Sequence, residues 1–350
     1  MMQNRLSTFN FKKLIKIIFT VALAVIITIV LDRIFAPKYV NENLDGRITA
    51  EFYREEEPLD LIAFGSSTVY NAIDTDKLNE ELGIHSYLRA NASQTLWQSY
   101  YLLKDSLIDQ NPELIMLDVS FIKNGEEFIE EPSNRKCIEN MRPSIYKYKA
   151  IKESMYHEEH PETYFLPVFR YHSRWKELGI DDLKYAFYIP NVTKHGYIRE
   201  DGVAKDQKIY EPDPENENAL LMKYEGAEDL MNAGVFPDKA VKYLDMFVDE
   251  CAKKNIPLML FKTPTYVANW YSAYDNWLED YVNHKNSQFK ANGSSYSIDY
   301  VNYDEYADKM GIVVSEDYYD DGEHLNHSGA IKFSSYLIDD LKAKYPSVFK

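Results

Sequence analysis

A stretch without charge near the N-terminus constrains this chain more than any other feature of its sequence. No charged residue occurs in the 15 positions 17–31, and apolar flanks extend the segment. It thereby reaches about the 20 residues that a membrane-spanning helix needs. Four basic residues and no acid precede it (Arg5, Lys12, Lys13 and Lys16). Because positive charge stays on the cytoplasmic side, the sequence predicts an anchor with its N-terminus inside the cell.

The expected membrane organisation follows from this segment. Residues 1–13 are predicted to be cytoplasmic, residues 14–36 to form the anchor, and residues 37–57 to form a polar stalk outside. A cleaved signal peptide is the alternative. The residues that follow the apolar run, Asp32-Arg33-Ile34-Phe35, are a poor cleavage site. The sequence therefore favours a single-pass protein of the cell membrane whose main domain, 58–350, lies outside the cytoplasm.

Composition excludes several classes of protein. The 350 residues carry 39 basic and 56 acidic side chains, for a formal net charge of −17. Without the five basic residues and one acid of positions 1–36, the rest holds 34 basic and 55 acidic residues. Such an acidic domain excludes a general nucleic-acid binder, which needs a basic face. Two cysteines, Cys137 and Cys251, exclude a disulfide scaffold and leave the possibility of a single bridge open.

Strand-like and helix-like segments alternate along residues 58–350. Apolar strand-like runs occur at 59–64, 84–90, 113–119, 256–261 and 297–303. The helical segments between them predict an α/β fold, with a doubly wound, flavodoxin-like parallel sheet of five strands. Residues 120–235 lack this rhythm and are expected to be an insertion after the third strand that covers one edge of the sheet. Active sites of such sheets lie at the carboxyl ends of the strands.

Two short segments are expected to meet at that edge. Gly65-Ser66-Ser67 ends the first strand, and Asp321 and His324 lie three residues apart before the last helix. A serine hydroxyl needs a base to become a nucleophile, and histidine has a suitable pKa. A carboxylate can hold the imidazole in the productive tautomer. The pattern predicts Ser67 as nucleophile, His324 as base and Asp321 as the orienting acid.

With Leu325, Asn326 and Gly329 downstream, these two segments resemble the blocks of the SGNH (GDSL-like) hydrolase family. The anchor resembles that of the membrane-anchored, DltD-like branch associated with polysaccharide O-acyltransferases. The family aspartate after Gly65 is a serine here, so Ser66 is an alternative nucleophile. The family's glycine and asparagine blocks for the oxyanion hole are missing. We therefore expect the Ser67 amide with Asn91 or Gln94 to supply that hole.

The resemblance implies a serine O-acyltransferase that uses an acyl-Ser67 intermediate. Acetyl is the expected acyl group. The implied partner is a membrane-bound O-acyltransferase, and the implied acceptor is a polysaccharide or teichoic-acid-like polymer of the cell envelope. An exported carbohydrate esterase and a non-catalytic glycan-binding or assembly subunit are the alternatives.

A basic and aromatic cluster in the insertion is a weaker candidate. Four of its residues could bind an anionic or sugar acceptor (Arg170, His172, Arg174 and Trp175), although a salt-bridged helix explains them equally well. No cofactor and no metal are expected, because the histidines of His157-Glu158-Glu159-His160 are three apart, not four as in zincins.

Overall fold

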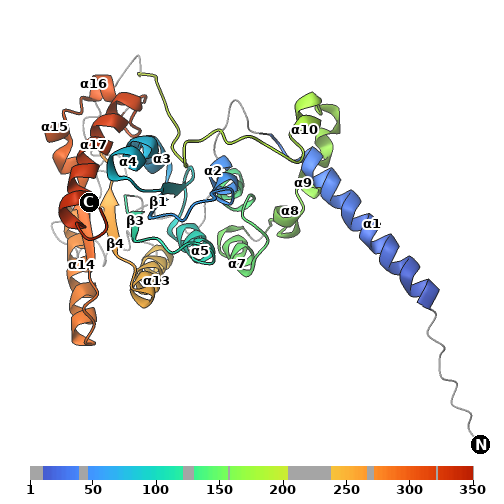
Figure 1. Ribbon diagram of the computed structural model, residues 1–350, viewed down its shortest axis with the longest axis horizontal. Helices are drawn as coiled ribbons and strands as arrows, with labels where there is room; N and C mark the ends of the chain where they lie inside the picture. Colours follow the sequence, from blue (N-terminus) through green and yellow to red (C-terminus); the bar gives the residue numbers. More distant parts are fainter. Residues whose placement is uncertain are drawn as a thin grey trace, which may run out of the picture. The chain divides into compact units, whose positions relative to one another are not determined.

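The computed structural model describes residues 11–38, 46–120, 130–156, 158–203, 238–265, 272–320 and 322–349 (Figure 1). The chain divides into two compact units. The smaller unit comprises Met1–Val40 and His160–Pro190, and the larger comprises Asn41–Glu159 and Asn191–Lys350.

The smaller unit is built on α1 (Phe11–Phe35). Among the described residues, this 25-residue helix is the one long and apolar enough to cross a membrane. Its accompanying elements are short: α8 (Glu162–Phe165), α9 (Val168–Tyr171), the 3₁₀ turn η1 (His172–Lys176) and α10 (Ile180–Lys184). α9, η1 and α10 contact α1 (Figure 1).

The larger unit contains the predicted parallel sheet. Its five strands run in the order β2-β1-β3-β4-β5, and all pairs are parallel. The strands are β1 (Leu61–Gly65), β2 (Ser86–Ala90), β3 (Leu114–Asp118), β4 (Leu258–Lys262) and β5 (Ile298–Asn302). This confirms the α/β class and the five-stranded parallel sheet. Strand order reverses beside β1 and β3, the point at which doubly wound sheets place ligands.

Helices cover both faces of this sheet (Figure 1). One face carries α5 (Leu96–Ser106), α13 (Asp238–Lys254) and α14 (Ser272–Ala291); the other carries α3 (Ser67–Ala72), α4 (Thr75–Leu82) and α17 (His327–Lys344). Every residue of β1 to β4 is buried, which explains why most of their residues are apolar. Three short helical elements precede the last helix: η3 (Tyr303–Tyr306), α15 (Ala307–Met310) and α16 (Val314–Asp317).

Different parts of the segment between β3 and β4 belong to different compact units. α6 (Glu131–Ile138) and α7 (Ile145–Ser154) belong to the larger unit, where α7 packs on α5, whereas 160–190 join α1. Residues 191–203 follow the edge of β2, where the Leu88 amide donates to the His195 carbonyl at 3.0 Å. A segment of the expected insertion therefore does cover one sheet edge. Its parts 121–129 and 204–235 lie outside the described residues.

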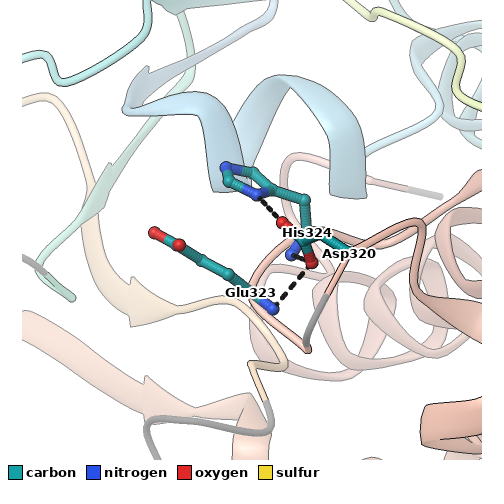
Figure 2. A group of neighbouring side chains, drawn as sticks. All are labelled: Asp320, Glu323 and His324. Atoms are coloured by element: carbon teal, nitrogen blue, oxygen red, sulfur yellow. Dashed lines mark hydrogen bonds and ion pairs between the residues drawn. The ribbon is translucent and has the colours of Figure 1, made fainter. Parts of the chain in front are cut away.

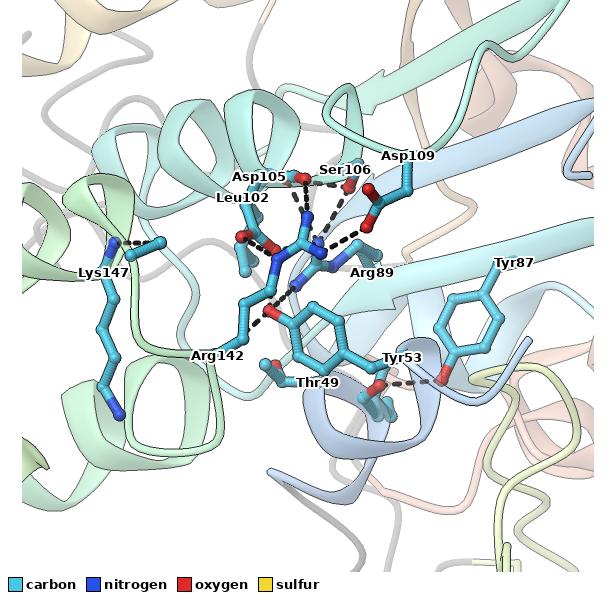
Figure 3. Close-up of polar contacts among 12 residues, drawn as sticks. Thr49, Tyr53, Tyr87, Arg89, Leu102, Asp105, Ser106, Asp109, Arg142 and Lys147 are labelled. Carbon is cyan, nitrogen blue, oxygen red and sulfur yellow. Dashed lines mark hydrogen bonds and ion pairs between the residues drawn. The ribbon is translucent and has the colours of Figure 1, made fainter. Parts of the chain in front are cut away.

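The region expected to be a stalk is partly folded. α2 (Arg47–Phe52) packs on β2, and five of its six residues are buried, so residues 47–52 belong to the domain. Just beyond it, the Tyr53 hydroxyl donates to Asp105 at 2.7 Å. Asp105 also pairs with Arg89 at 3.1 Å, and both of these side chains are fully buried (Figure 3). This ion pair ties β2, α5 and the end of α2 together.

Candidate active site

Ser67 stands at a sharp turn between β1 and α3. It is the first residue of α3, and it follows Gly65, the last residue of β1, by two positions. A Cβ atom on Gly65 would come within 2.3 Å of Val69 Cγ2 and 2.7 Å of Asp118 Cβ. Only glycine fits where the strand end, α3 and β3 approach so closely. The turn leaves Ser67 half-buried at the carboxyl edge of the sheet.

His324 faces Ser67 from the loop before α17. Its Nε2 lies 2.7 Å from Ser67 Oγ. The loop is held at both sides: Asn326 caps α17 by accepting from the Gly329 amide, and a Cβ on Gly329 would lie 2.4 Å from the Asp317 carbonyl oxygen. The predicted pairing of Ser67 with His324 is thus present, because the β1 turn and the loop before α17 meet at one edge.

Among the described residues, the acid that faces His324 is Asp320, whereas the sequence predicted Asp321. Asp320 Oδ2 lies 2.5 Å from His324 Nδ1, and Oδ1 accepts the backbone amides of Gly322, Glu323 and His324 at 2.9–3.2 Å. Asp321 lies outside the described residues. The loop folds around the Asp320 carboxylate, with Gly322 at φ 102°, and so a neighbour four residues before His324 takes the orienting position.

The pKa of Asp320 is lowered. Partial burial acts to raise it, but the hydrogen bonds from the His324 side chain and the backbone amides of His324 and Glu323 outweigh that effect. Asp320 therefore stays ionised at neutral pH and can accept the Nδ1–H of His324. That leaves Nε2 as the atom that accepts the Ser67 proton.

Asp320, Glu323 and His324 also form a group with three potential metal-ligand atoms within 4.8 Å of one another (Figure 2). Asp320 and His324, however, are hydrogen-bonded directly to each other, and Figure 2 marks no bond from the Glu323 carboxylate to the imidazole. A zinc ion about 2.1 Å from each ligand atom would have to replace that bond. The geometry fits a base held by a carboxylate better than a metal site.

Of the expected oxyanion donors, Gln94 has its side-chain amide engaged elsewhere. Gln94 Nε2 donates both of its hydrogens, to the Arg89 carbonyl and to Ser99 Oγ. Asn91 Nδ2 donates to Gln94 Oε1, and the Asn91 side chain is fully buried. These bonds stabilise the end of β2. Because both Gln94 hydrogens are already donated, Gln94 has none left for an oxyanion. The Ser67 amide remains a candidate, since amides in the first turn of a helix lack intrahelical acceptors.

A second series of hydrogen-bonded side chains starts at Ser66, next to the nucleophile. Ser66 Oγ lies 3.0 Å from Thr68 Oγ1, which donates to the Asp118 carboxylate at 3.4 Å. Ser66 is therefore buried in this series and is not paired with His324. Asp118 also accepts from the Ser120 amide and hydroxyl. Burial raises the pKa of Asp118 to about 6, although the Ser120 hydrogen bonds and Lys262 oppose the shift.

Tyr319 is a site residue that sequence reasoning missed. Its ring stacks on the His324 imidazole, with centroids 5.4 Å apart and planes 23° from parallel. Its hydroxyl donates to Asn71 Oδ1 at 3.4 Å, which links the histidine loop to α3. The only sequence signal was the position of Tyr319 next to the acidic loop.

The basic and aromatic cluster belongs to the other unit. Arg170, His172, Arg174 and Trp175 lie in α9 and η1, within the unit that contains α1. Arg174 pairs with Asp182 at 3.0 Å and donates to the Phe35 carbonyl. Ser67 belongs to the other, larger compact unit. Cys137 and Cys251 are both buried free thiols, so no bridge joins them.

The sequence matches no protein-family model and no curated protein.

Proposed function

We propose that this protein is a membrane-anchored serine acyltransferase of the SGNH type, which carries its acyl group on Ser67. The single observation that supports this most is the hydrogen-bonded series of Ser67, His324 and Asp320, with bonds of 2.7 and 2.5 Å. A nucleophile, a base and an orienting acid in that order are the arrangement that acyl transfer through serine requires.

The chemistry has two symmetrical halves. His324 Nε2 takes the Ser67 proton as Oγ attacks the acyl carbonyl, and the imidazolium then protonates the leaving group. An acceptor hydroxyl next gives its proton to Nε2 and attacks the acyl-serine, which releases the new ester and restores the Ser67 hydroxyl. Asp320 stabilises the imidazolium in both halves.

The finer assignment extends the family resemblance. We propose acetyl as the acyl group, a polysaccharide or teichoic-acid-like polymer of the cell envelope as acceptor, and a membrane-bound O-acyltransferase as the acyl source. α1 would anchor the chain in the cell membrane, with the basic N-terminal side in the cytoplasm and Ser67 outside. The absence of charge from residues 17–31 and the basic residues Lys12, Lys13 and Lys16 before them support this topology.

The test follows the acyl group. Purified full-length protein is mixed with an aryl acetate and a soluble cell-envelope polysaccharide, and acetyl ester on the polymer is measured beside free acetate. The proposal predicts polymer acetylation that is lost in Ser67→Ala and kept in Ser66→Ala. Rapid acetate release without transfer would favour an esterase, in which water is the acceptor. No turnover in either assay would favour a non-catalytic glycan-binding role.

A further inference from the structure

The smaller unit exposes apolar side chains where a water-soluble surface would expose polar ones. In the described parts of residues 160–190, five large apolar side chains are 56–84% exposed: Phe169, Trp175, Ile180, Leu183 and Phe187. We call these five residues the apolar face. Single exposed apolar residues are ordinary, but a group of this size in one short segment indicates a contact surface.

Three charged groups of the same unit, Arg174, Asp182 and Asp32, are bonded within it. Arg174 pairs with Asp182 at 3.0 Å and donates to the carbonyl of Phe35, the last residue of α1. Asp32, in the last turn of α1, accepts from the Val168 amide at 2.7 Å. These bonds hold α9 and η1 against the C-terminal end of α1, so the apolar face lies at the point where the chain leaves the apolar segment.

The composition of residues 160–190 suits the same position. Eight of these 31 residues are aromatic, and four basic residues balance four acidic ones, in a chain whose net charge is −17. Tryptophan and tyrosine favour the boundary between lipid headgroups and hydrocarbon. A neutral segment also avoids the repulsion that the acidic remainder of the chain would meet at an anionic lipid surface.

We propose that residues 160–190 form an interfacial platform that rests in the headgroup region of the bilayer, with the apolar face inserted among the lipids. This inference rests on the membrane anchorage proposed above. Continuity with α1 favours lipid over another protein as the occupant, because a spanning helix brings the attached apolar face to the bilayer in every copy of the chain.

Site-directed fluorescence tests this in the full-length protein, reconstituted in phosphatidylcholine–phosphatidylglycerol nanodiscs. A polarity-sensitive thiol label is placed at Ile180→Cys and Leu183→Cys. Ile26→Cys in α1 reports insertion of the span, and Ile108→Cys, an exposed position of the larger unit, is the matched control. The wild-type chain is the blank, since both native thiols are buried. Each sample receives either headgroup-level nitroxide lipids or aqueous iodide.

The platform predicts that labels at 180 and 183 lose most of their emission to nitroxide lipids and resist iodide, while the label at 108 does the reverse. Labels at 180 and 183 that behave like 108, with 26 still quenched by lipid, would overturn the platform and leave the anchor intact. Protection from both quenchers would also overturn it, since a protein or a second copy would then cover the face. A label at 26 that lipids fail to quench would refute the anchorage as well.

Discussion

His324 Nε2 lies 2.7 Å from Ser67 Oγ, although 257 positions separate the two residues in the chain. The contact depends on two turns at one edge of the sheet, one after β1 and one before α17. One turn holds the nucleophile and the other holds the base, so both are needed for the reaction. The following predictions test this contact and the fold of the unit that contains it.

The identity of the orienting acid can be tested with neighbouring carboxylates. Asp320→Asn should lower the rate of acyl-enzyme formation by about 10⁴-fold, the size of effect that loss of such an acid has in serine proteases. Asp321→Asn should leave the rate close to that of wild type. Burst kinetics with an aryl acetate measure both variants. The reverse order of effects would place the acid where the sequence spacing first suggested.

The glycine before the nucleophile turn should not tolerate a side chain. Gly65→Ala places a methyl group 2.3 Å from Val69 Cγ2, and the overpacking should cost about 1–3 kcal/mol of unfolding free energy. It should also displace Ser67 and slow acylation. Gly179→Ala is the control, because a Cβ there meets no atom within 4 Å. Urea unfolding compares the two, and equal stabilities would contradict the tight turn.

The Arg89–Asp105 pair should be costly to break and cheaper to replace (Figure 3). Asp105→Leu leaves the fully buried Arg89 guanidinium without its carboxylate partner. This should destabilise the protein by about 3–5 kcal/mol. The double variant Arg89→Met/Asp105→Leu should lose less than the two single variants together. Chemical denaturation of all three variants measures this coupling. Strictly additive losses would mean that the buried charges do not depend on each other.

Asp118 should make stability depend on pH. Its pKa is raised to about 6 by burial, above the ordinary value of 3.8, so the folded state binds more protons between these values. The Asp118 contribution to stability is therefore present at low pH and falls as the pH rises from about 4 to about 6. Relative to wild type, Asp118→Asn should gain on the order of 2–3 kcal/mol between these limits.

Unfolding curves at several pH values between these limits test that trend. Exposed Asp308→Asn serves as the control and should show a constant difference from wild type. A constant difference for Asp118→Asn as well would show that its carboxylate does not titrate with folding.

The fold was accessible from the sequence because its strands are buried on both faces. The runs at 59–64, 113–119 and 256–261 are mostly apolar, and this pattern predicts a covered parallel sheet. Topology then brought Ser67 and His324 to one edge. α3 was missed, because its six residues are too few to show a helical period.

Side-chain partners within the site were less accessible. Asp320 and Asp321 are adjacent, and only the path of the loop decides which carboxylate faces the imidazole. Gln94 was expected at the oxyanion hole, yet its amide donates to the Arg89 carbonyl and Ser99 Oγ at the end of β2. Arg174 was expected to bind the acceptor. In the structure it pairs with Asp182 and also donates to the Phe35 carbonyl at the end of α1, a contact between positions 139 apart in sequence.

The central claim is that Ser67 is a nucleophile activated by His324. The most direct measurement treats the full-length protein with a serine-directed fluorophosphonate and locates the adduct by peptide mass spectrometry. We predict a single adduct on Ser67, lost in His324→Ala and retained in Ser66→Ala. An unlabelled Ser67, or labelling that persists unchanged without His324, would contradict the account.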